Sequence, residues 1–185
     1  MSENTKRIAI VYFSGSGTTR ACAQAVLEGA NTATTAASLY EIVGSDIAEG
    51  RWSNDAMAAE LDQADAIILG TPTYMGGVSA QLKAFMDAMA PRWYTGAWRN
   101  KLAAGFTVSA KTSGDKLNCL QGLNVFAMQM GMVWVGLDTA GSLELNPNGA
   151  FLGPAATAGT PDMLQDMDLE TLRYLGNRVA ELAAR

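Results

Sequence analysis

Five short segments of strand character alternate along the chain with segments of helical periodicity. The strand segments cover residues 8–13, 36–42, 66–70, 102–109 and 132–135. The segment 66–70 is apolar throughout, which is typical of a strand whose sheet is covered by helices on both faces. This alternation predicts an α/β fold in which a five-stranded parallel sheet has helices on both sides.

Helices are expected between these strands wherever a capping residue or an apolar stripe marks one. The first ends near Gly29, a short one follows Ser53 and ends near Leu61, and Ser79 caps the third. The last begins at Asp166 or Asp168. The apolar stripes of the last three helices are Val78, Leu82, Phe85, Met86 and Met89; Leu120, Leu123, Ala127 and Met130; and Leu169, Leu172, Leu175, Val179 and Leu182. The segments 44–52 and 136–160 are predicted to be loops.

Composition and length indicate one globular domain spanning residues 1–185. Apolar residues make up 49% of the chain and charged residues 17%, which excludes a disordered protein. A net charge of -5 argues against a nucleic-acid partner. The segment 1–7 has no long apolar run behind it, and no stretch approaches the roughly 20 apolar residues that span a bilayer. No signal peptide and no membrane partner are therefore expected, and a cytoplasmic location is the default.

Histidine is absent from the chain, and the two cysteines lie far apart. Cys22 and Cys119 fall within helical patterns, so we interpret them as buried small residues, not as a disulfide or a metal site. Without histidine, a histidine-based triad, most transition-metal sites and the usual proton shuttle near neutral pH are excluded. The chemistry of this protein needs a cofactor or other acids and bases.

The stretch 14–19, Ser-Gly-Ser-Gly-Thr-Thr, joins the first strand to the first helix and has the composition of an anion-binding loop. Glycines let the backbone wrap closely, amides at the helix N-terminus point inward, and the helix dipole favours negative charge. Hydroxyls at Ser14, Ser16, Thr18 and Thr19 add neutral donors. Since no lysine follows, the loop suits one phosphate monoester better than a triphosphate with magnesium. A serine-capped turn is the alternative interpretation.

Two further loops, 71–77 and 109–115, follow the third and fourth strands. In parallel α/β sheets, ligands bind beyond the carboxyl ends of the strands, so the three loops are expected to converge. The first loop is not Gly-x-Gly-x-x-Gly, and no acidic residue is placed to hold an adenosine ribose. The constellation therefore predicts a mononucleotide site.

At this point the sequence resembles the flavodoxin-like FMN proteins. Ser14-x-Ser16-Gly17-x-Thr19 matches the Thr/Ser-x-Thr/Ser-Gly-x-Thr phosphate loop of that superfamily. More narrowly, it is similar to the tryptophan-repressor-binding protein (WrbA) family of NAD(P)H:quinone oxidoreductases. The segments that carry this narrower resemblance are Gly70-Thr-Pro-Thr-Tyr-Met-Gly-Gly77, Trp93-x-x-Gly96-x-x-x-x-Lys101-Leu102 and Asn146-Pro-Asn-Gly-Ala150.

The resemblance implies a flavodoxin-like three-layer sandwich with strand order 2-1-3-4-5, FMN as cofactor and NAD(P)H as co-substrate. It also implies a quinone or similar small acceptor and a homo-oligomer, dimer or tetramer. The expected cofactor-binding residues are Ser14, Gly15, Ser16, Gly17, Thr18 and Thr19; Pro72, Thr73, Tyr74, Met75 and Gly76; and Ser109, Ala110, Lys111, Thr112, Ser113 and Gly114. The substrate residues are expected to be Trp93 and Gln129, with no metal. Tyr74 replaces the family's arginine, and Gln129-Met130 replaces its histidine pair.

Individual roles within these loops have simpler alternatives. Thr73, Tyr74 and Met75 are expected to direct backbone groups to the flavin edge, or else to form a proline-anchored turn. Lys111 is expected either to stabilise the reduced flavin or to face solvent. Asp115 is expected to be a loop cap, and a role as a general acid is the alternative. An aromatic cluster of Trp93, Tyr94 and Trp98 is expected in the loop before the fourth strand.

The leading functional hypothesis is a two-electron FMN oxidoreductase that takes electrons from NAD(P)H and passes them to a quinone or similar acceptor. The alternative is a flavodoxin-type carrier that moves electrons between protein partners. A receiver-type module of the same sheet order is excluded, because Tyr12-Phe13-Ser14 stands where an acidic pair is needed.

Overall fold

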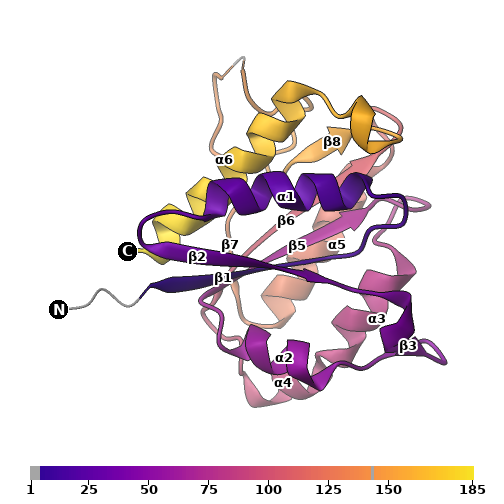
Figure 1. Ribbon diagram of the computed structural model, residues 1–185, viewed down its shortest axis with the longest axis vertical. Coiled ribbons are helices and arrows are strands. Elements are labelled where there is room, and N and C mark those ends of the chain that lie inside the picture. Colours follow the sequence, from indigo (N-terminus) through magenta and orange to yellow (C-terminus); the bar gives the residue numbers. More distant parts are fainter. Residues whose placement is uncertain (1–4, 143) are drawn as a thin grey trace.

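A parallel sheet of order β2-β1-β5-β6-β7 forms the centre of the computed structural model (Figure 1). The strands are β1 (Lys6–Tyr12), β2 (Thr35–Glu41), β5 (Ala66–Pro72), β6 (Leu102–Ser109) and β7 (Val133–Trp134). In the numbering of the five expected strands this is 2-1-3-4-5, so the predicted order is confirmed. The structure describes residues 5–142 and 144–185, so residues 1–4 of the segment judged free of a signal peptide lie outside it.

The two central strands are the most apolar parts of the sheet. Every residue of β5 is buried, and β1 is buried from Ile8 to Tyr12. The two strands pair in register, with Ile8 opposite Ala66 and Ile10 opposite Ile68. Uniformly apolar strands are favoured here because helices cover both faces.

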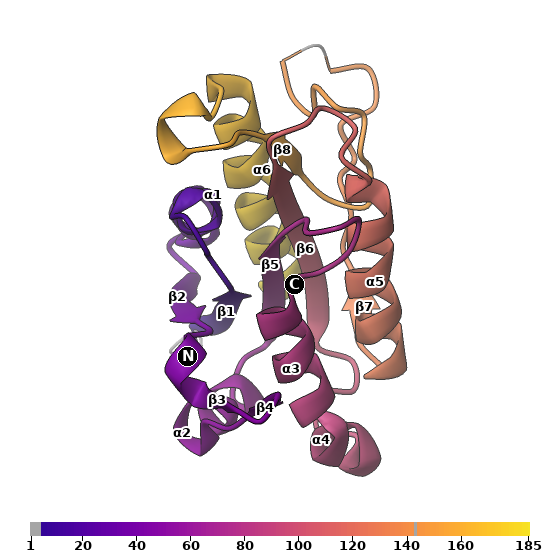
Figure 2. The ribbon, with the colours of Figure 1, turned by 90° about the vertical axis from the view of Figure 1, so that its right-hand side faces the viewer.

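Helices cover both faces of the sheet (Figure 2). On one face lie α1 (Thr18–Ala30) and α6 (Asp166–Ala183), and on the other lie α2 (Asp55–Asp62), α3 (Ala80–Ala88) and α5 (Lys116–Gln129). The short helix α4 (Ala90–Thr95) follows α3 and buries none of its own residues. Glycines let α1 and α6 approach closely: a Cβ on Gly29 would collide with the backbone of Arg173, and one on Gly176 with that of Val26. The buried cysteines confirm the interpretation given to them.

The outer strand beside β6 is split into two pieces. Its first piece, β7, pairs Val133 with Leu102 near the start of β6. Its second piece, β8 (Ala155–Thr157), pairs Ala155 with Thr107 near the end of β6. The prediction that 136–160 is loop throughout is therefore wrong for residues 155–157. Three residues are too few to show a period, and β8 forms only because the end of β6 offers an unpaired edge.

Two local predictions are corrected by backbone geometry. The segment 44–52 contains a 3-10 turn, Gly44–Asp46, and a hairpin of β3 (Ile47–Ala48) and β4 (Arg51–Trp52). The hairpin turns through Glu49 and Gly50, whose φ values of 51° and 76° match a two-residue hairpin turn. Asn54, not Ser53, caps α2, because its side chain accepts the amide of Met57 at 3.0 Å.

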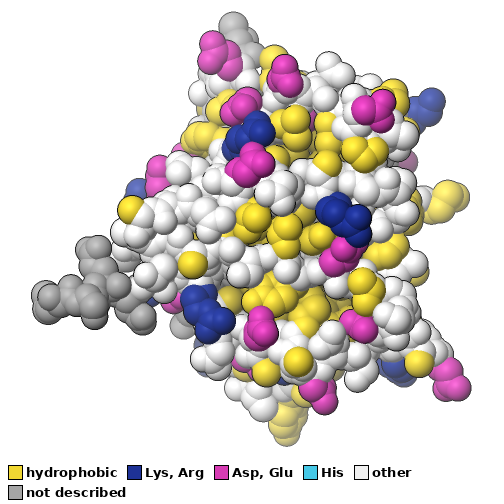
Figure 3. Space-filling view, viewed as in Figure 1, with side chains coloured by type: hydrophobic (Ala, Val, Ile, Leu, Met, Phe, Trp, Pro, Cys, Tyr) yellow, Lys and Arg dark blue, Asp and Glu magenta, His cyan; other side chains and the backbone are white. Residues whose placement is uncertain are grey.

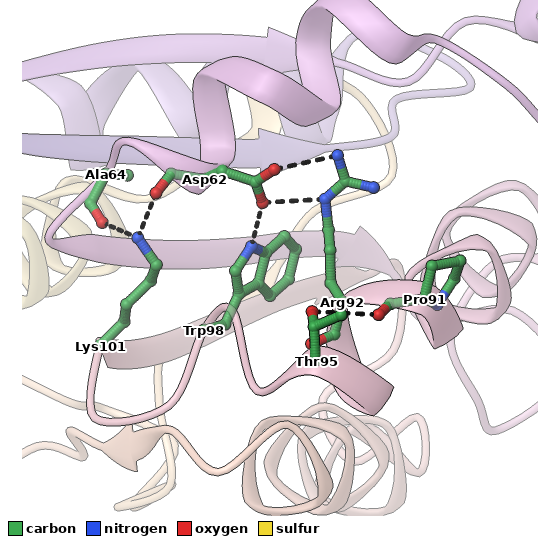
Figure 4. A network of polar contacts seen from close by, with 7 residues as sticks. All are labelled: Asp62, Ala64, Pro91, Arg92, Thr95, Trp98 and Lys101. Carbon is green, nitrogen blue, oxygen red and sulfur yellow. Dashed lines mark hydrogen bonds and ion pairs between the residues drawn. The ribbon is translucent and has the colours of Figure 1, made fainter.

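The segment before β6, expected to be a loop, contains the helix α4, which ends at Gly96 with φ 67°. Figure 4 shows what anchors it: the Asp62 carboxylate accepts Arg92 Nε at 2.8 Å and Trp98 Nε1 at 2.8 Å. Lys101 Nζ donates to the carbonyls of Asp62 and Ala64. Burial lowers the pKa of Lys101, and the negative charge of Asp62 partly offsets this effect. Trp98 is fully buried, so the expected aromatic cluster does not form.

On the face drawn in Figure 3, basic and acidic side chains are interspersed, and neither sign gathers into a patch. Several charges are paired, such as Arg173 with Glu28 at 2.8 Å. Among the helices of the described residues, none has the length and apolarity that crossing a membrane requires.

Candidate functional site

The loops after β1, β5 and β6 meet at one edge of the sheet (Figure 2), as expected. A Cβ on Gly15 in the first loop would lie 2.5 Å from the hydroxyl of Tyr74 in the second. A Cβ on Gly76 would lie 3.5 Å from the Cβ of Asp115, the last residue of the third loop. Asn118 Nδ2 also donates to the carbonyl of Gly76 at 2.7 Å. The three loops therefore form one continuous lining.

The first loop is shaped by its own serine. Ser14 Oγ accepts the amides of Gly17 at 3.1 Å and Arg20 at 3.2 Å. Gly17 is the N-cap residue of α1 with φ 91°, and it brings no side chain to cap the helix. The amide of Arg20 is thus used by Ser14, whereas the amides of Thr18 and Thr19 lie at the N-terminus of α1 beside the hydroxyls of Ser16 and Thr18, which are 3.4 Å apart. Ser14 thus also caps the first turn of α1, as expected from the alternative interpretation of this loop as a serine-capped turn.

The arginine in the first turn of α1 is neutralised by a carboxylate. Arg20 Nη2 lies 2.7 Å from Glu41 Oε1, and the hydroxyl of Tyr12 donates to Glu41 at 3.4 Å. The hydrogen bond to Glu41 raises the pKa of Arg20, and burial raises the pKa of Tyr12. With this cation paired, the loop presents mainly neutral donors, as the sequence predicted.

The second loop is a tight turn that uses some of its own donors. Tyr74 and Gly77 exchange both backbone hydrogen bonds at 3.0 Å, across Met75 (φ 47°) and Gly76 (φ 78°). The amide of Thr73 donates to the carbonyl of Val108 at 2.9 Å. The hydroxyl of Thr73 lies 2.7 Å from the hydroxyl of Thr107. The amides of Thr73 and Tyr74 are therefore bonded within the protein, and the prediction that residues 73–75 direct backbone groups to the flavin edge depends on their other backbone atoms. The feature that reaches across the site is the Tyr74 side chain, which is 48% exposed.

The third loop turns through two residues in the left-handed region, Gly114 (φ 51°) and Asp115 (φ 54°). Ser109 Oγ donates to the carbonyl of Lys111 at 3.1 Å. Lys111 is exposed, as in the simpler of its two interpretations. Asp115 stands at the N-cap of α5, but its side chain makes no capping bond, so its predicted role as a cap is wrong.

Trp93 and Gln129 lie together, but away from the three loops. Both line a groove of about 280 Å³ between α3, α4 and α5, along with Met86 and Val125. Gln129 is the last residue of α5, whose first residue adjoins the third loop. A helix of this length separates its ends by about 20 Å. Within one chain, the two expected substrate residues therefore do not reach the flavin loops.

Three functional candidates were missed by the sequence analysis. Lys116 is buried at the start of α5, Thr157 ends β8, and Asp168 is buried in the first turn of α6. Burial, and to a smaller extent the charge of Asp168, raises the pKa of Cys22 to about 12. No sequence signal marks these residues, because charged residues at helix starts are ordinarily exposed.

A model of the NADPH-dependent FMN reductase family matches residues 7–141. Flavodoxin FldP of Pseudomonas aeruginosa is 37% identical over 187 residues, 95% of this chain and 96% of that protein. An NAD(P)H dehydrogenase (quinone) of Geotalea uraniireducens is 31% identical over 199 residues, 97% of this chain and 98% of that protein. The crystal structure of a WrbA-like flavodoxin from Agrobacterium tumefaciens matches with a TM-score of 0.77 and 43% identity, over 96% of this chain and 97% of that chain. This chain therefore belongs to the NADPH-dependent FMN reductase family and has a flavodoxin-like fold.

Proposed function

We propose that the protein is an FMN-dependent oxidoreductase that passes two electrons from NAD(P)H to a quinone or similar small acceptor. The observation that carries the proposal is the first loop: Gly17 brings no capping side chain to the N-terminus of α1, the hydroxyls of Ser16 and Thr18 lie beside it, and the arginine of that turn is already paired to Glu41. Such a loop fits the phosphate of FMN, whose flavin ring supplies the hydride chemistry when bound. The quinone reductase relatives support the acceptor class.

The residues of this chain bind the FMN cofactor, orient it and cover part of its ring. The amides of Thr18 and Thr19, with the hydroxyls of Ser16, Thr18 and Thr19, would hold the phosphate group. The loops 72–76 and 109–114 line the ring. Tyr74 is the one aromatic residue of the three loops from 14 to 19, 71 to 77 and 109 to 115, so one ring face stays open to a flat substrate.

The flavodoxin-type electron carrier is the second candidate. The 37% identity with Flavodoxin FldP favours this second candidate, because it exceeds the 31% identity with the quinone reductase relative. A carrier exposes only the edge of its flavin to a protein partner. The sparse aromatic cover in the three loops speaks for the enzyme instead.

Anaerobic mixing of the FMN-loaded protein with NADH or NADPH is expected to bleach the flavin, and added benzoquinone to restore its colour. Because the chain contains no histidine, we expect turnover to change little between about pH 6 and 8. Stopped-flow absorbance follows both steps. If neither nucleotide bleaches the flavin while a chemical reductant does, the protein is a carrier and not an NAD(P)H-dependent enzyme.

We further propose a cytoplasmic homo-oligomer, dimer or tetramer, in which the groove that holds Trp93 and Gln129 faces the flavin site of another copy. The outer surface beside this groove is apolar: Tyr94 is 86% exposed, Val125 62% and Val133 51%. Large exposed apolar surfaces commonly mark association sites.

Light scattering at micromolar concentration is expected to give the mass of at least a dimer. Trp93→Ala is expected to slow benzoquinone reduction more than flavin bleaching by NAD(P)H, since stacking of a quinone on the indole is lost. Ala97→Ser, an exposed change after α4, serves as the control. A monomeric mass with unaltered quinone reduction in Trp93→Ala would contradict this arrangement.

A further inference from the structure

Two buried groups of opposite charge hold the same residue where β8, α5 and α6 meet. Lys116 Nζ donates to Thr157 Oγ1 at 2.6 Å and to the carbonyl of Ala155 at 3.0 Å. Asp168 Oδ2 accepts the amide of Thr157 at 3.0 Å. The lysine is 2% exposed and the aspartate 5%. Thr157 is thus fixed through its side chain by one helix and through its backbone by another.

Folding stability alone does not explain why these two charged residues are buried here. Burial lowers the pKa of Lys116 and raises the pKa of Asp168, and the opposite charge only offsets these effects. Buried charges are costly to desolvate, and replacing buried ionic groups by apolar residues of similar size is often neutral or stabilising. The reason for the pair is therefore sought in what Thr157 positions.

The chain that continues from Thr157 supports two of the three flavin loops. The amide of Ala158 donates to the carbonyl of Ser109 at 3.0 Å, at the start of the third loop. A Cβ on Gly17 in the first loop would lie 3.5 Å from Pro161 Cγ. A shift of Thr157 would therefore be transmitted to the third loop and to the N-terminus of α1.

We propose that Lys116 and Asp168 are positioning residues for FMN, which act by holding residues 155–161 against the first and third loops. The inference rests on the proposed FMN site. Lys116 also directly follows the third loop and fixes its end, so the same cation holds the loop and the segment behind it. Neither residue needs to touch the flavin: each acts through Thr157.

The test compares FMN affinity with the stability of the apoprotein in two variants. Lys116→Met with Asp168→Leu removes both charges, and Thr157→Val removes only the hydroxyl that Lys116 contacts. Fluorescence titration of the apoprotein with FMN is expected to show an affinity loss of about tenfold in each, which equals about 1.4 kcal/mol. The melting temperature of the apo double variant is expected to change little, because removal of the two buried charges offsets the loss of the hydrogen bond to the Thr157 amide.

Lys101→Met is the matched control, because Lys101 is also partly buried and donates to backbone carbonyls, at the opposite end of the sheet. It is expected to lower the melting temperature and leave FMN affinity unchanged. If the double variant does not fold, Thr157→Val decides alone. Unchanged affinity in the folded variants overturns the proposal while the FMN site stands; a wild-type protein that does not bind FMN overturns both.

Discussion

Ser16→Ala combined with Thr19→Ala is expected to weaken FMN binding by a factor of about 100 or more. Each hydroxyl that donates to a charged phosphate contributes about 1.5–3 kcal/mol net, and two are lost. Ser16 is exposed at the mouth of the first loop, and Thr19 lies in the first turn of α1. The arginine of this turn is bound to Glu41, so it is poorly placed to compensate.

Titration of the apoproteins with FMN, followed by flavin fluorescence, measures this effect. Thr34→Ala is the control, since its exposed hydroxyl contacts Thr32 in the turn that follows α1. The control is expected to bind like the wild type. An unaltered dissociation constant in the double variant would reduce Ser16 and Thr19 to ordinary residues of a capped turn, and the phosphate site would have to lie elsewhere.

Gly176→Ala is expected to lower the free energy of unfolding by about 1–3 kcal/mol, as overpacking typically does. The added Cβ would collide with the carbonyl of Val26 and would lie 2.8 Å from the amide nitrogen of Ala30. Both are backbone atoms of α1, so the helices must separate for the methyl group to fit. This cost outweighs the gain of about 0.8–1 kcal/mol that alanine brings to a helix interior.

Gly122→Ala provides the matched control on another helix. Gly122 also lies inside a helix, α5, but the nearest neighbour of an added Cβ is Val78 Cγ1 at 3.9 Å. This variant is expected to gain about 0.5–1 kcal/mol, because only the helix propensity changes. Denaturant unfolding of the apoproteins measures both. A Gly176→Ala protein as stable as Gly122→Ala would show that α1 and α6 do not pack this closely.

Local signals were sufficient for much of this protein. The apolar run 66–70 and the stripe of Leu120, Leu123 and Ala127 depend only on which side chains neighbour one another along a strand or helix. Ser79 caps α3 as expected, its hydroxyl accepting the amide of Leu82 at 3.3 Å. The anion loop was visible because its glycines and hydroxyls are consecutive in the chain.

Other features depend on residues distant in sequence. β8 is a strand only because β6 has a free edge beside it, and α4 is held by Asp62, about thirty residues earlier in the chain, at the end of α2. The amides of Thr73 and Tyr74 are likewise bonded to the carbonyls of Val108 and Gly77, which the sequence did not reveal. Such partners are chosen by tertiary contacts that no periodicity records.

The sequence by itself predicted the five main strands and the helices between most of them, the glycine- and hydroxyl-rich loop after β1, and a chemistry without histidine. These follow from residue types in consecutive or regularly spaced positions. The tertiary structure alone decided that Lys116 and Asp168 are buried around Thr157, and that Trp93 lies across the molecule from the flavin loops. Whether a charge is buried depends on the elements that pack over it, and here α5 begins about forty residues before β8, which in turn precedes α6.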